Sequence, residues 1–265
     1  ESAADVIVVL RRKLDLFANI RPAKSYPNTP ALRDDIDLVI VRENTEDLYT
    51  GQEFELDGSA VAMRIITEKA SKRIAKHAFQ TAIQRNGKKR VTCVHKSNVM
   101  RKTDGLFAKS CESVAKEFPD IKFDQMYVDA CSMNLIRQPQ EFDIIVTTNL
   151  FGDILSDESS QVVGGLGMAP AANIGDKFGL FEPVHGAAFD IAGKQIANPT
   201  SFILSIKMML EWLGVKNNDQ NSSNVAKILE DVISDIIKSG VTTKDIGGTM
   251  TTRDFTNEII NKLSS

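Results

Sequence analysis

Two kinds of hydrophobic pattern alternate along this chain, and each predicts one type of secondary structure. Short apolar runs rich in β-branched residues predict strands, at Leu38–Arg42, Ala60–Ile66, Val91–His95, Lys122–Val128 and Asp143–Thr148. Longer segments with helical periodicity predict helices, at Glu68–Arg85, Thr103–Phe118, Asp153–Val163, Ser201–Leu213 and Ser223–Ser239. Because strands alternate with helices, we expect an α/β fold.

Two further segments contain residues that predict a loop or a turn. The stretch Gly164–Ala172 is rich in small residues and predicts a loop or hinge between two bodies. The pair Asp57-Gly58 stands between apolar residues and is a hairpin signal, so residues 51–66 are expected to form a projecting β-arm.

Composition narrows the class of protein. The chain has 265 residues, is 42% hydrophobic and 25% charged, and carries a net charge of −3. Nothing in this balance favours nucleic acid or an anionic membrane as a partner. No apolar run approaches the ~20 residues of a membrane span. Three scattered cysteines favour a reducing compartment, so we expect a cytoplasmic protein.

Two carboxylates, Asp153 and Asp157, lie one helical turn apart just after a predicted buried strand. Like charges at this spacing repel, whereas a bound Mg²⁺ or Mn²⁺ turns them into ligands. The end of a strand is also where open α/β sheets bind ligands. The alternative is a solvated helix start, where acids suit the helix dipole.

Three arginines, Arg11, Arg21 and Arg42, stand in patterned apolar contexts. Arginine recognises carboxylates with a fork of donors, so these three predict a substrate with two or more carboxylates. Taken singly, each arginine is more typical of an ordinary surface position.

Two residues are candidates for proton transfer. Tyr49 follows Arg42 by seven residues, and Lys96 follows the strand at Val91–His95. A lysine near arginines or a metal has its ammonium form disfavoured, which prepares it to act as a base. An exposed lysine at a strand end is the alternative.

The segment 182–193 reads EPVHGAAFDIAG and predicts a nucleotide-binding loop. Its small residues allow the backbone to approach a ligand closely. Asp190 would accept hydrogen bonds from ribose hydroxyls and repel a 2′-phosphate, which favours NAD over NADP. His185 alone is also compatible with a structural role. The chain has no GxGxxG, so the ordinary Rossmann fingerprint is absent.

Taken in order, these pieces resemble the isocitrate/isopropylmalate dehydrogenase family, the β-decarboxylating dehydrogenases. The resemblance covers essentially the whole chain, in the stretches LRRKLDLFANIRP (10–22), IVRENTEDLYTG (40–51), VHKSNVMRKTDGLF (94–107), YVDA (127–130), NLFGDILSDESS (149–160), ANIGD (172–176) and EPVHGAAFDIAGKQIANP (182–199).

The resemblance implies a role for each candidate residue. Arg11, Arg21 and Arg42 would grip the substrate carboxylates. Tyr49 and the Lys96 of a partner subunit would be the acid and base. The metal ligands would be Asp153 and Asp157, joined by Asp129 from the partner subunit. The adenosine half of NAD would be held by His185, Gly186, Ala187, Ala188, Asp190 and Asn198, with Asn98 reaching the nicotinamide across the interface.

The helix that carries Arg11 would also distinguish substrates. In this family it presents Ala4, Ile7 and Val8 on the same face as Arg11. An apolar face suits an isopropyl group and would leave a third carboxylate unpaired. We therefore expect 3-isopropylmalate as the substrate, with isocitrate, homoisocitrate and malate-type acids as alternatives.

Two features of this segment point elsewhere. The family's isopropylmalate enzymes often have Glu at the Ala4 position, and Asp5 stands where isocitrate enzymes have Ser. The run Val6–Val9 alone favours a strand. We follow the resemblance and expect a helix.

The resemblance implies a two-domain subunit. A large cofactor domain would combine residues 1–17 and 164–265, and a small domain would span 18–163. Helices near 103–118 and 153–163 would pack against a partner, which makes a homodimer the minimal active unit. The family pattern begins with a strand and a glycine-rich turn before the Glu1 position, and we expect this N-terminal portion to be absent.

Two rival functions remain. A non-catalytic regulatory subunit is disfavoured because every catalytic position is filled. A metal-dependent hydrolase would use the aspartate pair but leaves the segment 182–193 unexplained.

Overall fold

The computed structural model describes residues 3–264, with side chains from Val6 onward. The expectations for Glu1 and for the side chains of Ala4 and Asp5 lie outside this range. The contacts within the chain define two compact units. The first comprises Glu1–Arg21, Asp37–Glu158 and Asn173–Leu180, and the second Pro22–Ile36, Ser159–Ala172 and Phe181–Ser265. The predicted domain boundaries stay a prediction.

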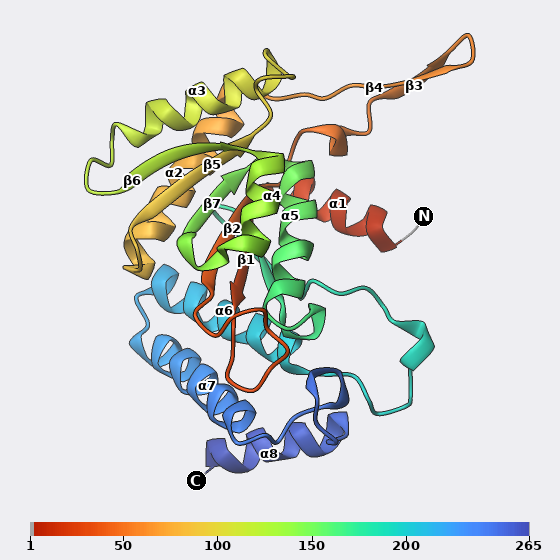
Figure 1. Ribbon diagram of the computed structural model, residues 1–265, viewed down its shortest axis with the longest axis vertical. Coiled ribbons are helices and arrows are strands. Elements are labelled where there is room, and N and C mark those ends of the chain that lie inside the picture. Colours follow the sequence, from red (N-terminus) through yellow and green to blue (C-terminus); the bar gives the residue numbers. More distant parts are fainter. Residues whose placement is uncertain (1–2, 265) are drawn as a thin grey trace. The chain divides into compact units, whose positions relative to one another are not determined.

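Strands and helices alternate over most of the chain (Figure 1). The strands are β1 (Ala18–Lys24), β2 (Asp37–Glu43), β3 (Glu53–Leu56), β4 (Ser59–Ala62), β5 (Arg90–His95), β6 (Lys122–Tyr127), β7 (Ile144–Thr147), β8 (Pro170–Ile174) and β9 (Gly179–Pro183). The α-helices are α1 (Ala3–Lys13), α2 (Glu68–Arg85), α3 (Thr103–Ala115), α4 (Val128–Arg137), α5 (Asn149–Val162), α6 (Thr200–Asn217), α7 (Gln220–Lys238) and α8 (Thr252–Ser264).

Seven strands form a sheet in the order β6-β5-β7-β2-β1-β8-β9. The neighbouring pairs β6–β5, β5–β7 and β7–β2 are parallel. The carboxyl ends of these four strands therefore meet at one edge, where parallel α/β sheets bind ligands. The residues that follow them at this edge include Asn44, Lys96, Thr148 and, after Tyr127, Asp129.

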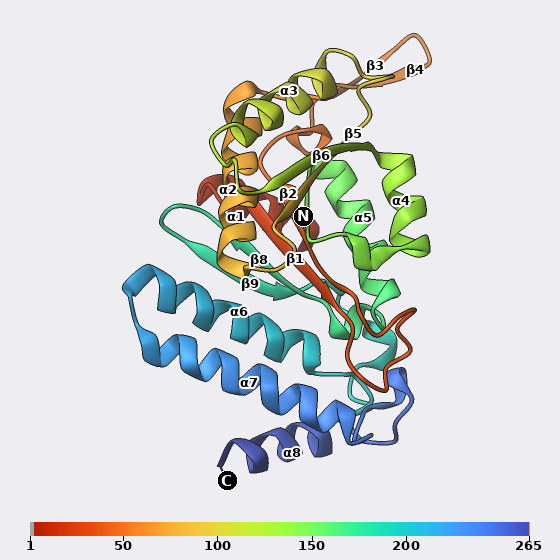
Figure 2. The same cartoon turned by 60° about the vertical axis from the view of Figure 1, so that its left-hand side comes forward.

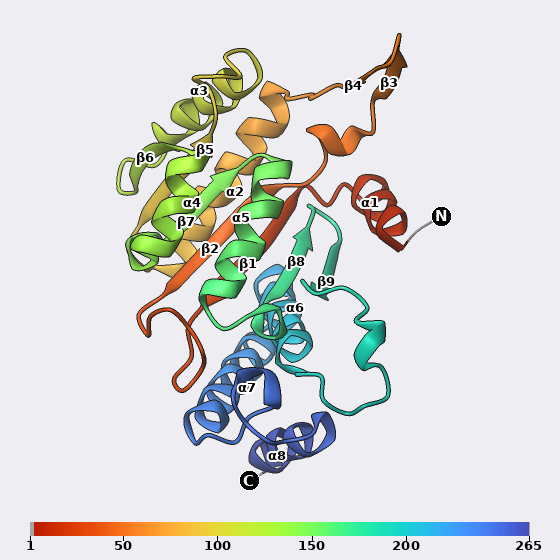
Figure 3. The ribbon, with the colours of Figure 1, turned by 45° about the vertical axis from the view of Figure 1, so that its right-hand side comes forward.

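Helices cover both faces of this part of the sheet. Helix α2 lies on one face, with α3 packed beside it, and α4 and α5 lie on the other (Figures 2 and 3). Strands β2 and β7 are buried on both faces, which explains their nearly continuous apolar sequences.

The predicted β-arm is confirmed, and it extends away from the first unit (Figure 1). Asp57 and Gly58 have φ values of 44° and 78° between β3 and β4. Positive φ at both central residues defines the turn that fits the twist of a two-residue hairpin. Strand β4 ends at Ala62, so the predicted strand at Ala60–Ile66 is shorter than expected.

Local signals define helix α2 at both ends. Its N-cap Thr67 accepts a hydrogen bond from the Ala70 N–H, and Asn86 ends it in the left-handed conformation with φ 50°. Between them Ile74, Ala78 and other residues of one face are buried. The predicted range Glu68–Arg85 is confirmed at both boundaries.

Glu46 ties this helix to the end of β2. It accepts hydrogen bonds from the Thr67 N–H and hydroxyl, both at 2.8 Å. Burial raises the pKa of the Glu46 carboxyl to about 7, with Glu43 and Asp47 adding repulsion. The folded state thus holds this proton more tightly than the unfolded chain, whose glutamate pKa is near 4.5. Its contribution to stability is present below pH 4.5 and is lost as pH rises towards 7.

We therefore expect Glu46→Gln to remove a pH-dependent loss of stability. The difference in melting temperature, wild type minus variant, should decrease as the pH is raised from 4.5 to 7. Calorimetry over this pH range measures the difference. The effect of the other carboxylates cancels in it, because both proteins contain them. Parallel curves for the two proteins would contradict the assignment.

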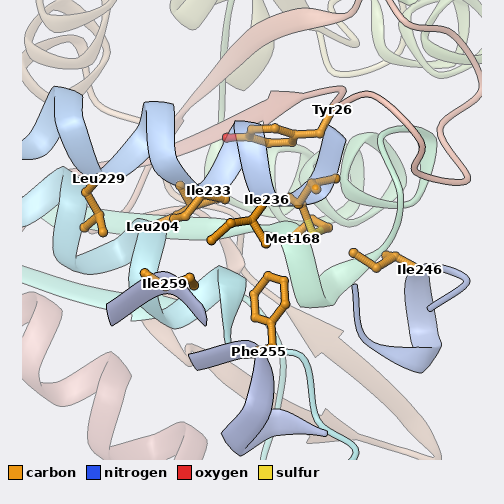
Figure 4. Close-up of a cluster of buried hydrophobic side chains, with 10 residues drawn as sticks. Tyr26, Met168, Leu204, Leu229, Ile233, Ile236, Ile246, Phe255 and Ile259 are labelled. Atoms are coloured by element: carbon orange, nitrogen blue, oxygen red, sulfur yellow. The ribbon is translucent and has the colours of Figure 1, made fainter. Parts of the chain in front are cut away.

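The second unit has its own hydrophobic core (Figure 4). Apolar side chains from α6, α7, α8 and the segments around them converge in the buried cluster Tyr26, Met168, Leu204, Leu229, Ile233, Ile236, Ile237, Ile246, Phe255 and Ile259. Helices α6 and α7 approach closely at Gly214, where a Cβ would lie 2.3 Å from the Ser223 Oγ.

Several elements differ from the sequence predictions. Part of the predicted loop Gly164–Ala172 belongs to strand β8, whose residues are all buried. The elements β1, β9, α4 and α8 were not predicted. Segment α1 is a helix, as expected from the resemblance and against its strand propensity. Within residues 3–264, no helix is long and apolar enough to cross a membrane.

Candidate active site

Arg42 enters the site from the end of the buried strand β2, and its side chain is 1% exposed. Its Nε donates to the Asn149 Oδ1 at 2.8 Å, and its Nη1 pairs with the Asp153 Oδ1. Asn149 is the first residue of α5. The start of this helix is thus joined to the end of β2.

Tyr49 and Arg21 complete this cluster in the first unit. The Tyr49 hydroxyl donates to the Asp153 Oδ2 at 2.7 Å, and the Arg42 guanidinium lies 5.1 Å over its ring. Arg21 donates from Nη1 to the Asp157 Oδ1 at 3.2 Å and lies 3.6 Å from the Asp153 Oδ1. The structure therefore brings together Arg21, Arg42, Tyr49, Asp153 and Asp157.

Burial and the neighbouring charges shift the pKa values of Asp153, Asp157 and Arg21. Burial acts to raise the pKa of Asp153, but Arg42, the Tyr49 hydroxyl and Arg21 outweigh it, and the pKa is lowered. Burial raises the pKa of Asp157. Burial and the neighbouring Arg42 lower the pKa of Arg21 to about 10, and Arg11 adds to this repulsion. Three neighbouring guanidinium groups are the donors that suit an anion such as a carboxylate.

Asp153 and Asp157 are also accessible, with side chains 41% and 60% exposed. Their carboxylate oxygens are the donors that Mg²⁺ prefers, and this ion is commonly held by one or two carboxylates together with a substrate. The donor set therefore fits a divalent cation. Within the described part of the chain, no group of three acidic, histidine or cysteine side chains is arranged to hold a metal.

Lys96 and Asp129 form a second pair at the same sheet edge. The Lys96 Nζ pairs with the Asp129 Oδ1, and this contact lowers the pKa of the Asp129 carboxyl. The Asp129 side chain is 67% exposed. Asn98 follows in an exposed turn.

Helix α1 places its aliphatic residues beside Tyr49. Ile7 and Val8 are half-buried and Arg11 is buried. An open cavity of about 340 Å³ separates α1 from the short 3-10 helix Leu48–Thr50, and it is lined by Val8, Val9, Arg12, Leu48, Tyr49, Thr50 and Gly51.

The predicted nucleotide segment is an exposed loop of the second unit. His185, Gly186, Ala187, Ala188 and Asp190 are all exposed or half-buried. Ala188 adopts the left-handed conformation with φ 45°, and the following Phe189 is 86% exposed. Small residues and an exposed acid leave the loop backbone open to a ligand.

Asn198 differs from the rest of this segment because it is buried. Its Oδ1 accepts from the Thr200 N–H at 3.0 Å at the start of α6, and its Nδ2 donates to the Asp245 Oδ2 at 3.0 Å. Its side chain is thus held within the second unit next to the start of α6, and its role in cofactor binding stays a prediction.

The comparisons with known proteins decide the family. The sequence profile of isocitrate/isopropylmalate dehydrogenases matches residues 1–259. The chain belongs to this family. Its members are β-decarboxylating dehydrogenases, and they typically use NAD(P) and a divalent metal.

The relatives are named for more than one substrate. The chain is 56% identical to the 3-isopropylmalate dehydrogenase of Sulfurisphaera tokodaii, over 99% of this chain and 77% of the relative. It is 49% identical to the isocitrate/homoisocitrate dehydrogenase of Thermus thermophilus, over 97% of this chain and 74% of the relative. Among solved structures, isocitrate dehydrogenase from Methylococcus capsulatus has a TM-score of 0.92 at 42% identity, covering 100% of this chain and 78% of that one. The predicted α/β fold of this family is confirmed.

A glycine in α5 explains how the dehydrogenase cluster packs so closely. A Cβ at Gly152 would lie 2.5 Å from Cγ and 2.6 Å from Cβ of Arg42. We expect Gly152→Ala to displace the Arg42 guanidinium, and a displacement of 1 Å at such a site costs about 100-fold in kcat/KM. Steady-state kinetics with a 2-hydroxy acid substrate measures this loss.

Gly105, which lies in helix α3, provides the matched control. A Cβ there meets nothing within 4 Å. Gly105→Ala should keep wild-type kinetics and stabilise the helix by about 0.5–1 kcal/mol. Equal kcat/KM values for the two variants would show that Arg42 tolerates the extra methyl group.

The sequence analysis missed three polar residues of this region. Asp47 and Asp104 lie inside family stretches but were given no role, and Arg64 lies outside every such stretch. All three are joined by ion pairs in the structure. A lone arginine after the β-arm has no local pattern that would reveal its distant partners.

Proposed function

We propose that this chain catalyses the NAD-dependent oxidative decarboxylation of 3-isopropylmalate to 2-oxoisocaproate and CO₂, with Mg²⁺ or Mn²⁺. The cluster of Arg21, Arg42, Tyr49 and Asp153 is the observation that carries the reaction class. It combines forked cations for carboxylates, a hydroxyl for proton transfer and accessible oxygens for a cation. The aliphatic residues Ile7 and Val8 support the isopropyl substituent.

A second candidate substrate is isocitrate or homoisocitrate. The Thermus thermophilus relative named isocitrate/homoisocitrate dehydrogenase is 49% identical to this chain. Arg12 favours this candidate, because it lines the cavity beside Val8 and Tyr49. Its guanidinium would be the partner for a third carboxylate.

The substrate would lie against the first unit with its carboxylates held by Arg11, Arg21 and Arg42. Desolvated guanidinium groups fix both ends of a diacid and orient its hydroxyl-bearing carbon. Asp153 and Asp157 would hold the metal, which supplies a Lewis acid that lowers the pKa of the substrate hydroxyl. The nicotinamide ring of NAD⁺ supplies the acceptor for the hydride.

Two residues of the chain would move the protons. Lys96 of the partner subunit would take the proton from the substrate hydroxyl as the C–H electron pair leaves. After CO₂ has left, Tyr49 would donate the proton of its hydroxyl to the carbon that carried the lost carboxylate. The burial of Tyr49 and its hydrogen bond to Asp153 raise the pKa of this phenol, which keeps it protonated for that step.

We further propose that the active form is a homodimer. Lys96 and Asp129 pair with each other at a surface of the first unit, whereas Asp153 and Asp157 pair with Arg21 and Arg42. We propose that a second copy brings Lys96 and Asp129 to Asp153 and Asp157, so that Asp129 of the partner subunit would be the third metal ligand.

The dimer surface would be formed by α4 and α5. Both helices present exposed apolar side chains, among them Met133, Ile136 and Ile154. Most apolar residues of α3, including Phe107 and Cys111, are buried, and α3 packs on α2. We therefore propose α4, in place of the predicted helix at 103–118, as the partner of α5 in a four-helix interface.

For the cofactor, we propose that His185, Gly186, Ala187, Ala188, Asp190 and Asn198 hold the adenosine half of NAD. The exposed, small-residue loop supports this proposal. Asp190 would select NAD by repelling a 2′-phosphate. Asn98 of the partner subunit would reach the nicotinamide.

A comparison of substrates tests the proposal directly. NADH formation is followed with 3-isopropylmalate, isocitrate and homoisocitrate in the presence of Mg²⁺ or Mn²⁺. We expect the highest kcat/KM for 3-isopropylmalate, and Arg12→Gln should leave that value unchanged. A preference for isocitrate that Arg12→Gln abolishes would establish the second candidate instead.

A further inference from the structure

Arg64 is a half-buried cation, with a side chain 10% exposed, between two carboxylates that have no exposed surface. Its Nε and Nη2 donate to the two carboxylate oxygens of Asp47, at 2.6 and 3.2 Å. Its Nη1 donates to the Asp104 Oδ1 at 2.6 Å. All three residues belong to the first unit, and none of them is part of the proposed chemistry.

The Asp47 end of this ion pair holds the segment that carries Tyr49. The Asp47 Oδ1 accepts a hydrogen bond from the Leu48 N–H at 2.9 Å, at the start of the 3-10 helix Leu48–Thr50. Asp47 itself has φ 73°, which is an unfavourable conformation for a residue with a Cβ. Contacts from outside the segment must therefore maintain it, and Arg64 supplies two of them.

The Asp104 end holds the backbone of Lys96. The Asp104 Oδ2 accepts a hydrogen bond from the Lys96 N–H at 2.5 Å, directly after strand β5. The position of the Lys96 side chain is thus linked to the same guanidinium through a single carboxylate.

The third connection reaches the helix of the metal carboxylates. The Arg64 Nη2 donates to the Thr148 Oγ1 at 2.7 Å, and the Asp47 Oδ2 accepts from the Leu150 N–H at 3.1 Å. The guanidinium also lies 4.7 Å over the ring of Phe151. Thr148 directly precedes α5, and Leu150 and Phe151 lie in its first turn. The carboxylates Asp153 and Asp157 follow in the next turns.

We propose that Arg64 is a positioning residue that fixes Tyr49, Lys96 and the start of α5 relative to one another. This inference rests on the proposed function, because that function assigns the chemistry to Tyr49, Lys96 and Asp153. A planar guanidinium has five donors in a rigid fork and reaches several acceptors at once, which a lysine ammonium does not. Without it, two buried carboxylates would be left uncompensated.

The test compares Arg64→Lys with Arg73→Lys in the full chain. Arg73 is a matched control because its Nη1 also pairs with an aspartate, Asp15, at 2.8 Å, and its guanidinium also lies over an aromatic ring, Phe17, at 4.2 Å. We expect Arg64→Lys to lower kcat about 100-fold, with the KM for NAD⁺ unchanged within about twofold. Arg73→Lys should match the wild type. A folded Arg64→Lys protein with wild-type kcat would overturn the proposal.

A crystal structure of each variant gives a readout that does not depend on activity. The Tyr49 hydroxyl donates to the Asp153 Oδ2 at 2.7 Å. In Arg64→Lys we expect this contact to be lost because the segment that carries Tyr49 has moved, and in Arg73→Lys we expect it to persist. An unchanged Tyr49–Asp153 contact in Arg64→Lys would overturn the proposal.

The two readouts separate this inference from the proposed function. If the wild type forms no NADH with any 2-hydroxy diacid, the proposed function fails, and the structure of Arg64→Lys still decides the role of Arg64. If Arg64→Lys does not fold, Thr148→Val replaces it, since this substitution removes one Arg64 contact and preserves the shape of the side chain. We then expect a several-fold lower kcat and a normal KM for NAD⁺, and a wild-type kcat would overturn the proposal.

Discussion

Replacing Lys96 by methionine should abolish nearly all turnover and leave NAD binding intact. Loss of a general base lowers kcat by about 10²–10⁴-fold. Methionine preserves the length of the side chain but offers no group that can accept a proton. Lys96 does not belong to the loop that we propose for the adenosine half of NAD, so the dissociation constant for NADH should stay within about twofold of the wild-type value. Steady-state kinetics and NADH fluorescence measure the two quantities.

Lys109 supplies the control for this experiment. It is exposed on α3, and the contacts described for the site do not include it. Lys109→Met should therefore preserve both kcat and NADH affinity. The substitution at Lys96 also removes its pairing with Asp129, but Asp129 is an exposed carboxylate and loses little when unpaired. Wild-type turnover in Lys96→Met would rule out Lys96 as the base.

The elements predicted well are those whose ends are encoded locally. Helix α2 begins after Thr67 and ends before Asn86. The Thr67 side chain caps its start, and Asn86 readily adopts the left-handed conformation that ends it. The β-arm follows from Asp57 and Gly58 alone. In each case a few adjacent residues determine the conformation.

The elements that were missed lack such local signals. In β1 the buried Arg21, together with Pro22 and Lys24, interrupts the apolar pattern of a strand. Arg21 is buried because Asp157 and Ser156 of a distant helix receive its hydrogen bonds. Helix α4 follows Tyr127 at the end of β6 without turn residues between them, so no boundary is visible in the sequence.

The candidate site was only partly predictable for the same reason. Helical spacing alone relates Asp153 to Asp157. The meeting of Arg42 and Tyr49 with Asp153 depends on how β2 and α5 pack, and the contact across Gly152 that allows it appears only in three dimensions. The same holds for Arg64, whose partners Asp47, Asp104 and Thr148 are 17, 40 and 84 residues away.

Mixing two inactive variants is expected to restore activity if the site is shared between subunits. Lys96→Met removes the proposed base, and Asp153→Asn removes a proposed metal ligand. In a heterodimer of the two, one site receives Asp153 from the first chain and Lys96 from the second, so it is intact. The other site carries both defects. Random exchange of subunits in a symmetric dimer should therefore recover about a quarter of the wild-type activity.

The reference for this experiment is the same mixture without subunit exchange, combined immediately before the assay. It should remain as inactive as each variant alone. Dissociation at low concentration or in mild denaturant, followed by reassociation, then measures the recovery. If Lys96 served Asp153 of its own chain, each chain of the heterodimer would carry one defective site and no activity would return. Since both arrangements use the same residues, the recovered activity distinguishes a shared site from one built within a single chain.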